Sequence, residues 1–322
     1  MGVYIIELCY NRRWNSSDKS FIGISGSLVD NRPFICAYFQ TAIWCLRFTI
    51  AFQCIGISGR YLFAIFETES PIYGLLYFDF GLHEVTSQLI DDLGAYSCLI
   101  ASGLLLACGL FRILSGFSLS DKASLRLFTI DAGALFLVVI WTLSMAIGQT
   151  IRGDIFARFT LLEEAVRIAA PFALLALLMT NRLSNRLLFP KWAIIVLISA
   201  TSMTFALHGY KAIMLYGPFV DFLLLSKPLG ITMASNQETA EAMLTVIGGI
   251  DIALAISIVF LRWQAIALYM AAWGLLTAFS RITAGGMDSW PELFIRAANA
   301  GVPLTLFFLF RSKILLKTKC IT

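Results

Sequence analysis

The sequence has few charged residues, and this scarcity excludes several classes of protein. Only 14% of its 322 residues are Asp, Glu, Lys or Arg, whereas 59% are hydrophobic. Soluble domains are typically about 25% charged and about 45–50% apolar, because polar groups must cover their surfaces. The mean hydropathy of +0.81 therefore predicts an integral membrane protein. It also excludes disordered, collagen-like and disulfide-scaffold chains.

Motifs that would identify a common catalytic or nucleotide-binding site are also missing. The sequence has no Walker loop, no G-x-G-x-x-G motif, no H-E-x-x-H and no Ser/His/Asp order typical of hydrolases. None of its seven cysteines forms a C-x-x-C pair, and there are only two histidines, so no metal site is predicted. The aromatic residues are typical of lipid-facing and interfacial positions, and we expect no nucleic-acid partner.

Eight stretches are apolar and long enough to cross a bilayer core, which needs about 20 residues per helix. They cover residues 42–66, 93–111, 128–149, 164–180, 192–216, 243–262, 264–283 and 293–310. The almost unbroken apolar run 246–280 is too long for one helix, so we divide it at 262–264 into a tight hairpin. The predicted fold class is all-α, an integral membrane bundle of eight transmembrane helices.

The positive charges favour a topology with both termini in the cytoplasm. With the amino terminus inside, the cytoplasmic segments hold fifteen Lys and Arg residues and the outer loops hold four. This asymmetry is what orients multi-pass proteins. We therefore predict a protein of the bacterial inner (plasma) membrane, in contact with membrane lipid. Residues 1–41 and 312–322 would be its cytoplasmic tails.

The two halves of the chain carry matching residues. The pairs are Trp141 with Trp273, Gly153 with Gly285, Glu163 with Glu292, Arg167 with Arg296, and Pro171 with Pro303. A half with an even number of helices keeps its copy in the same orientation, as in a parallel duplication. We predict two parallel four-helix units, 42–190 and 191–311. The alternative is coincidence between apolar segments of similar composition.

Polar residues of the second half gather toward the outer side of the predicted bilayer. The candidate binding residues are His208, Asp251, Arg281, Glu292 and Arg296. Ionisable residues inside a membrane are costly, so they usually face the bundle interior or a wet cavity. We expect these five to line an outward-facing pocket. In it, Arg281 and Arg296 would bind an anionic or carbonyl group, and Asp251 or His208 would exchange a proton.

A structural interpretation of these charges stays open beside the functional one. Long side chains near helix ends can extend to the lipid headgroups, or they can form ion pairs that hold the bundle together. We expect Arg47 to extend to the inner interface and Lys211 to be an interface anchor. In one interpretation, only the second half keeps a working site.

A set of short motifs in the second half connects it to a known family. They are His208-Gly209, Gly248 with Asp251, Thr277-Ala278 with Arg281, Gly285-Gly286, and Glu292 through Arg296 to Pro303. With these residues, segment 192–311 resembles the DoxX-like family of four-helix membrane proteins, and the first half looks like a degenerate copy. The resemblance implies a role in a membrane redox process, with other membrane redox subunits as partners.

Three functions are compatible with the sequence, which does not decide whether the protein is an enzyme. The preferred function is a redox-associated protein that binds a quinone or a small oxyanion, with quinone or haem as candidate cofactor. A haem held by two histidines would need His208 and His83 at one site. The second function is a secondary transporter of a small anionic or polar solute, although no predicted helix is plainly interrupted at the bilayer midplane. The third is a non-catalytic membrane scaffold subunit.

Overall fold

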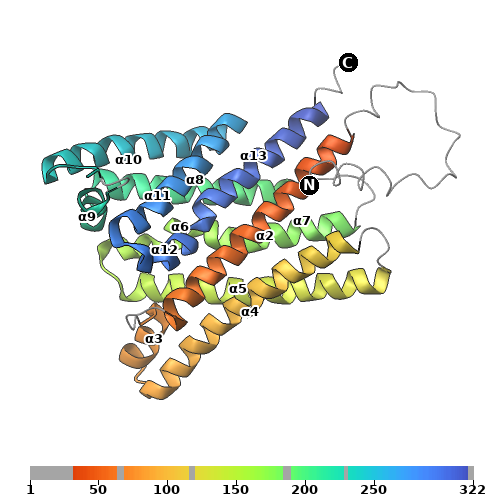
Figure 1. Ribbon diagram of the computed structural model, residues 1–322, viewed down its shortest axis with the longest axis horizontal. Helices are drawn as coiled ribbons and strands as arrows, with labels where there is room; N and C mark the ends of the chain where they lie inside the picture. Colours follow the sequence, from red (N-terminus) through yellow and green to blue (C-terminus); the bar gives the residue numbers. More distant parts are fainter. Residues whose placement is uncertain (1–31, 64–68, 116–119, 184–189, 228–230, 318–322) are drawn as a thin grey trace, which may run out of the picture.

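The computed structural model describes residues 32–63, 69–115, 120–183, 190–227 and 231–317, and within these ranges it is all-helical (Figure 1). Eight long helices follow one another: α2 (Arg32–Leu62), α4 (Glu84–Leu114), α5 (Asp121–Arg152), α7 (Ala165–Leu183), α8 (Lys191–Ile213), α10 (Gln237–Phe260), α11 (Gln264–Gly285) and α13 (Ala297–Lys317). The short helices between them are α3 (Pro71–Gly74), η3 (Leu75–Asp79), η4 (Ile155–Phe159), α6 (Thr160–Glu163), α9 (Gly217–Leu225), η6 (Met287–Ser289) and α12 (Trp290–Ile295).

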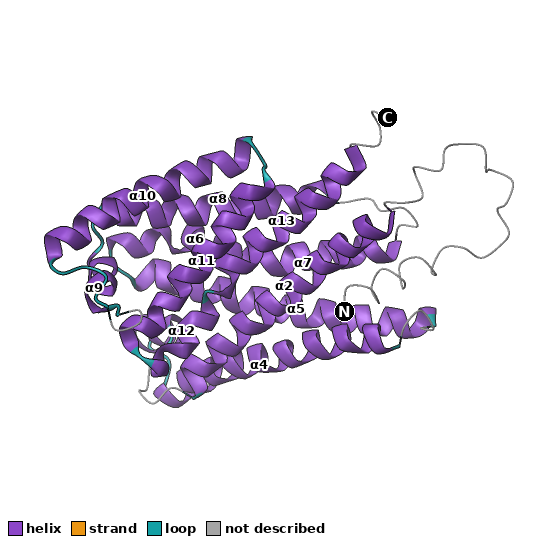
Figure 2. Ribbon diagram, turned by 45° about the horizontal axis from the view of Figure 1, so that its top comes forward, coloured by secondary structure: helices purple, strands orange, loops and turns teal. Residues whose placement is uncertain are grey.

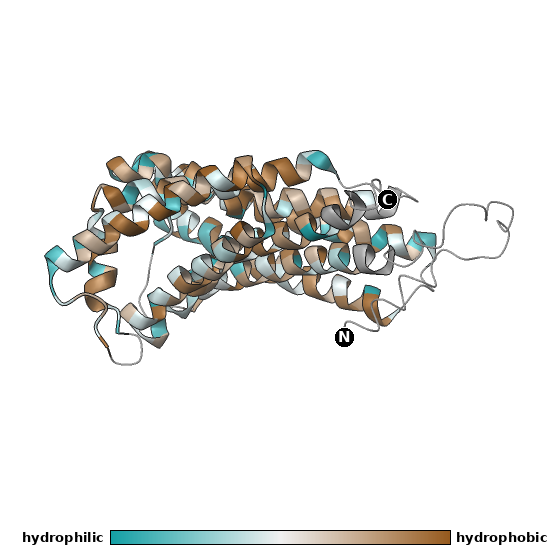
Figure 3. Ribbon diagram, turned by 90° about the horizontal axis from the view of Figure 1, so that it is seen from above, coloured by the Kyte–Doolittle hydropathy of each residue, from teal (hydrophilic) through white to brown (hydrophobic). Residues whose placement is uncertain are grey.

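Six helices of the described ranges are long and apolar enough to cross a membrane, or seven if the broken pair α12–α13 is one span. This composition indicates a multi-pass membrane protein, and Figure 3 shows how apolar residues dominate the long helices. Each of the eight stretches predicted to span overlaps one long helix, although 293–310 also crosses the break between α12 and α13 and 42–66 extends beyond the end of α2. The predicted hairpin is confirmed, since α10 ends at Phe260 and α11 begins at Gln264.

The predicted tails differ from the structure at their inner boundaries. Helix α2 already begins at Arg32, inside the predicted tail 1–41, and α13 continues to Lys317, inside the predicted tail 312–322. Residues 1–31 and 318–322 lie outside the described part of the chain. The apolar pattern placed both boundaries too close to the bilayer, because helices extend beyond the hydrocarbon core.

Capping side chains explain where several helices begin. Ser120 Oγ accepts a hydrogen bond from the backbone N–H of Ala123 at 3.3 Å at the start of α5. Asn236 Oδ1 accepts one from the N–H of Thr239 at 2.9 Å at the start of α10. These side chains satisfy donors that a first helical turn leaves without an intrahelical partner. The apolar stretches that follow stay helical, because a helix satisfies its own backbone groups in lipid.

The same order of elements occurs twice along the chain. A long helix, a short helix, two long helices, a 3-10 turn, a short helix and a last long helix run from α2 to α7 and again from α8 to α13, and the first set has one additional element, the π-helical turn η3. The first helix of each set packs against the last helix of the other set, α2 on α13 and α8 on α7. One continuous apolar core therefore joins both halves, with side chains such as Leu46, Leu174, Leu197 and Leu306 fully buried in it.

The short helices gather at one end of the bundle. Figures 1 and 2 both place α9 and α12 at the end opposite the start of α2 and the end of α13. Helix α12 lies directly against α2 at Gly56, where an added Cβ would fall 2.4 Å from the backbone nitrogen of Ile295. Only glycine permits this close approach. It brings the end of α2 against α12, where the polar residues described below are found.

A buried ion cluster joins α2, α4 and α5, away from the end of the bundle where the short helices gather. Arg47 donates to both carboxylate oxygens of Asp131, at 2.8 and 2.6 Å, and to the carbonyl of Leu105 at 2.7 Å. Arg112 donates to the same carboxylate at 2.8 Å. The side chains of Arg47 and Asp131 are 2% and 0% exposed. The prediction that Arg47 extends to the interface is therefore wrong, because its charge has a buried partner on α5.

Replacing Asp131 with Asn is expected to destabilise the protein strongly. The substitution leaves the Arg47 guanidinium buried without a carboxylate, and breaking such a pair costs about 3–5 kcal/mol. The measurement is the unfolding temperature of the purified protein in detergent. Asp121→Asn, at the exposed start of the same helix, is the matched control, with an expected cost of about 0.3–1 kcal/mol. Equal unfolding temperatures for the two variants would contradict the role assigned to the cluster.

Candidate functional site

A polar cavity of about 440 Å³ lies between the two sets of helices, toward the end of the bundle where the short helices gather. Its walls come from α2, α3, α5, η4, α6, α7, α8, α9, α11 and α12. The residues with charged side chains that line it are Arg60, Asp154, Glu163, Glu164, Arg167, Lys211, Arg281, Glu292 and Arg296. Five positive charges thus face four carboxylates, and His208 adds a group that is charged only when protonated.

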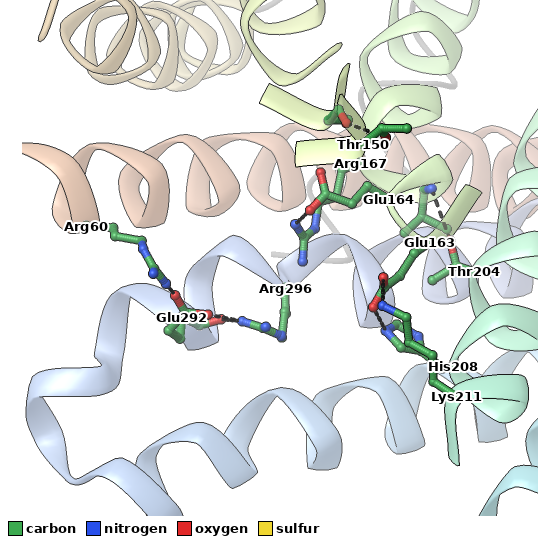
Figure 4. A network of polar contacts seen from close by, with 12 residues as sticks. Arg60, Thr150, Glu163, Glu164, Arg167, Thr204, His208, Lys211, Glu292 and Arg296 are labelled. Carbon is green, nitrogen blue, oxygen red and sulfur yellow. Dashed lines mark hydrogen bonds and ion pairs between the residues drawn. The ribbon is translucent and has the colours of Figure 1, made fainter. Parts of the chain in front are cut away.

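The cavity wall formed by α2 and α12 contains one shared carboxylate. Glu292 makes ion pairs with both Arg60 of α2 and Arg296, four residues further along its own chain. A second group lies across the cavity, where Glu163 forms ion pairs with Lys211 and, at 3.3 Å, with Nε2 of His208. Figure 4 shows these two groups, with Glu164 and Arg167 between them. The cavity charges therefore form three groups of ion pairs, and two of these groups join the two halves of the chain.

Lys211 has a different role from the predicted one. Its side chain is only 6% exposed and its ammonium pairs with Glu163. A lysine at the lipid interface would keep its ammonium in water, so the prediction of an interface anchor is wrong. Its partner comes from the short helix α6, and only the packing of α6 against α8 brings the two together.

Two helices that line the cavity are interrupted. Helix α6 ends at Glu163 and α7 begins at Ala165, and α12 ends at Ile295 and α13 begins at Ala297. The second pair is bent by 44° at the break. Glu164 and Arg296 are the residues between the segments, and both line the cavity. Both breaks are occupied by charged residues and lie toward the end of the bundle where the short helices gather. That no helix is interrupted at the bilayer midplane stays a prediction.

Arg281 is the cavity cation without an ion pair to a carboxylate in the described part of the chain. Its guanidinium carbon lies 3.5 Å from the ring centre of Phe222 of α9, and its Nε is buried without a hydrogen-bond acceptor. The charges of Arg296 and Arg167 repel that of Arg281, and the carboxylate of Glu163 attracts it more weakly. An anion in the cavity would relieve this repulsion and accept the unused hydrogen bond.

Aromatic residues around α9 cover several of the cavity cations. The ring centre of Tyr216 lies 5.1 Å from the ammonium of Lys211, and that of Phe219 lies 6.1 Å from the His208 ring. Together with Phe222 over Arg281, they form a row at a spacing of three residues. Burial raises the pKa of the Tyr216 phenol, and the carboxylates of Asp154 and Glu163 raise it further. The phenol thus stays protonated and able to donate a hydrogen bond.

The structure brings together four of the five candidate residues predicted from the sequence. His208, Arg281, Glu292 and Arg296 line the cavity, and Asp251 does not. Asp251 is buried where α10 crosses α8, with its Cβ close to the position that a Cβ on Gly209 would occupy. The backbones approach there because both helices carry glycine. The expectation that Asp251 lines the pocket is therefore wrong, because its side chain lies where α10 crosses α8.

The other histidine is also separate from the cavity. His83 is the N-cap of α4, and its Nδ1 accepts a hydrogen bond from the backbone N–H of Val85 at 3.3 Å. It does not line the cavity that contains His208. Because the chain has only two histidines, a haem with both as axial ligands does not fit this arrangement. In the described part of the chain, no group of three His, Cys, Asp or Glu side chains is placed to bind a metal ion.

Sequence reasoning missed the contribution of the first half. Arg60, Glu163, Glu164 and Arg167 line the same cavity as the residues of the second half. The interpretation in which only the second half keeps a working site does not describe this arrangement. The match between the Glu163 and Glu292 segments was the signal that would have found three of them. Arg60, at the end of α2, has no such signal in the sequence.

Replacing Glu163 with Gln is expected to destabilise the protein by about 3–5 kcal/mol, because the buried ammonium of Lys211 loses its carboxylate. The second substitution Lys211→Met should recover most of this loss, since it removes the unpaired charge. Glu238→Gln, on an exposed first turn of α10, is the control and should have little effect. The single substitution Lys211→Met completes the cycle, and unfolding temperatures in detergent measure all four variants. Additive effects of the two cavity substitutions would contradict the pairing.

Comparisons with protein-family models, with curated proteins and with solved structures found no match for this chain.

Proposed function

We propose that the protein binds a small anionic solute in the cavity, within a membrane-embedded helical bundle. The observation that carries this proposal is Arg281, a largely buried cation that has no ion pair with any carboxylate of the described residues and has two further arginines nearby. Guanidinium groups bind carboxylates and other planar oxyanions with two parallel hydrogen bonds. An anion is thus the ligand whose charge and hydrogen-bonding geometry match the cavity.

A quinone is a weaker candidate for the same space. Quinones have an apolar ring and tail, and sites for such ligands are lined mainly by apolar and aromatic side chains. The lining here is dominated by charged and amide side chains, and its aromatic rings are those of Tyr61, Tyr216 and Phe219. We therefore favour the oxyanion over the quinone. If the protein has the redox role that its resemblance to DoxX-like proteins implies, the redox reaction would involve the bound anion.

Transport of the anion is the second candidate function, and the two broken helices favour it. Secondary transporters place their binding sites between repeated units, at helices that are interrupted inside the membrane. Here the breaks at Glu164 and Arg296 face one cavity from two sets of helices with the same element order. We propose that these sets are duplicated units and that all eight long helices cross the membrane.

The proposed setting is the bacterial inner membrane, with both termini in the cytoplasm. This orientation rests on the distribution of Lys and Arg among the loops. The cavity would then open toward the outer side, because its residues lie at the helix ends remote from the start of α2. A solute arriving from that side would meet the short helices α9 and α12 first.

Replacing Arg281 with Gln is expected to weaken anion binding by about 10–100-fold, because a hydrogen bond to a charged group contributes about 1.5–3 kcal/mol. The measurement is calorimetric titration of the purified protein with sodium acetate, propionate, lactate, sulfate and nitrate, at constant sodium concentration. Arg281→Lys keeps the charge and should retain part of the affinity.

The control for this experiment is Arg158→Gln, an exposed arginine of η4 that does not line the cavity. It should bind the anions like the wild-type protein. If no anion binds to the wild-type protein, or if Arg281→Gln and Arg158→Gln bind the anions with equal affinity, the proposed function is wrong.

Transport predicts uptake of the bound anion into proteoliposomes containing the wild-type protein. Vesicles with Arg281→Gln should lose most of the uptake at low anion concentration, since the solute is no longer captured. The measurement is entry of a radiolabelled anion, with and without an imposed proton gradient. Binding without any uptake would leave the redox or scaffold role and exclude the transporter.

A further inference from the structure

Gln53 is a second unpaired polar group of the same cavity, independent of the charged network. It lies on α2, one turn before Ile57 and two turns before Arg60 and Tyr61, so these four residues share one helix face that lines the cavity. The Gln53 side chain is fully buried, and neither its amide nitrogen nor its amide oxygen has a hydrogen-bond partner among the residues that the structure describes.

An unpartnered amide is unusual in a protein interior. Buried polar side chains are nearly always hydrogen-bonded, and each exception calls for a specific explanation such as an absent ligand. On the same face of α2, Ile50 and Ile57 are buried apolar residues of the core and offer the amide no hydrogen bond. Gln53 is one of the residues that line the cavity, so the missing partner is expected there.

The chemistry of the amide restricts what this partner is. A glutamine side chain offers two N–H donors and one carbonyl acceptor. A carboxylate or another fully deprotonated oxyanion satisfies only the donors. A hydroxyl group satisfies both, because it accepts from N–H and donates to the carbonyl oxygen.

The charges of the cavity restrict the ligand independently. Five Arg and Lys side chains face four Asp and Glu side chains, with Arg281 as the cation without an ion pair. One negative charge on the ligand balances this set, whereas two would leave an excess inside an apolar bundle. The cavity of about 440 Å³ is large enough for a ligand of several heavy atoms.

We propose that the ligand is a small hydroxyl-bearing monoanion, such as a hydroxycarboxylate, with its anionic group at Arg281 and a hydroxyl group at Gln53. This inference rests on the proposed anion-binding function and specifies its ligand class. Gln53 is then the residue that selects hydroxylated anions over their deoxy counterparts.

The test uses pairs of anions that differ in hydroxyl groups alone: glycolate with acetate, L-lactate with propionate, and D-gluconate with hexanoate. Calorimetric titration of the full-length protein in detergent should show tighter binding of the hydroxylated member in at least one pair, by about 100-fold. A site built to hydrogen-bond a hydroxyl rejects the analogue without it by a factor of this order or larger.

Gln53→Leu should abolish this preference. The affinity for the hydroxylated anion should fall to that for its deoxy partner, and the affinity for the deoxy partner should stay unchanged. Gln88→Leu, an exposed residue of α4 outside the cavity, is the matched control and should keep the preference. Unfolding temperatures without ligand provide a second readout. Gln53→Leu should not lower them, because it removes an unsatisfied buried amide, whereas a purely structural Gln53 would make the variant unstable.

The outcomes separate this inference from the function on which it rests. Equal affinities within every pair, with binding still dependent on Arg281, would overturn the role of Gln53 and leave the anion site intact. A preference that survives in Gln53→Leu would overturn it as well. If the wild-type protein binds none of the six anions, both the ligand class and the anion site are wrong.

Discussion

The structure depends on one constraint: a charged side chain inside an apolar bundle must find a partner of opposite charge. Removing an ion from water costs several kcal/mol even after the protein relaxes, so burial without a partner is rare. Arg47 satisfies the constraint with Asp131, and Lys211 satisfies it with Glu163. Both pairs join helices that are distant in the sequence, and they fix which helices pack together.

The chemical character of the cavity comes from the polar groups that have no such partner. Four of its five Arg and Lys side chains have carboxylate partners, and Arg281 instead packs on an aromatic ring. The fully buried Gln53 lacks a partner at another wall. Within the described ranges, Arg281 and Gln53 are cavity-lining groups that have neither an ion pair nor a full set of hydrogen bonds, and a polar ligand in the cavity would satisfy both. The interrupted helices support the same conclusion, since their breaks place charged residues at the cavity.

The arrangement of the two halves explains why the site could not be assigned to one of them. The first helix of each set packs against the last helix of the other, so the cavity receives side chains from both. Glu292 of the second half pairs with Arg60 of the first, and Glu163 of the first pairs with Lys211 of the second. Any conformational change of one set relative to the other would break or form these cross-pairs.

The sequence by itself determined the class of protein, the number and approximate limits of its long helices, and four of the residues at the cavity. The length of an apolar stretch and the polar residues that end it are local properties of the sequence, and they decide where a helix forms in lipid. Only the tertiary structure decided that Arg47 and Lys211 are buried and that Asp251 lies at the crossing of α8 and α10. It alone also placed Arg60 and Gln53 at the cavity. These outcomes depend on which distant helices pack together and how they are rotated, and that choice is made by side-chain packing and ion pairing between segments that no local pattern connects.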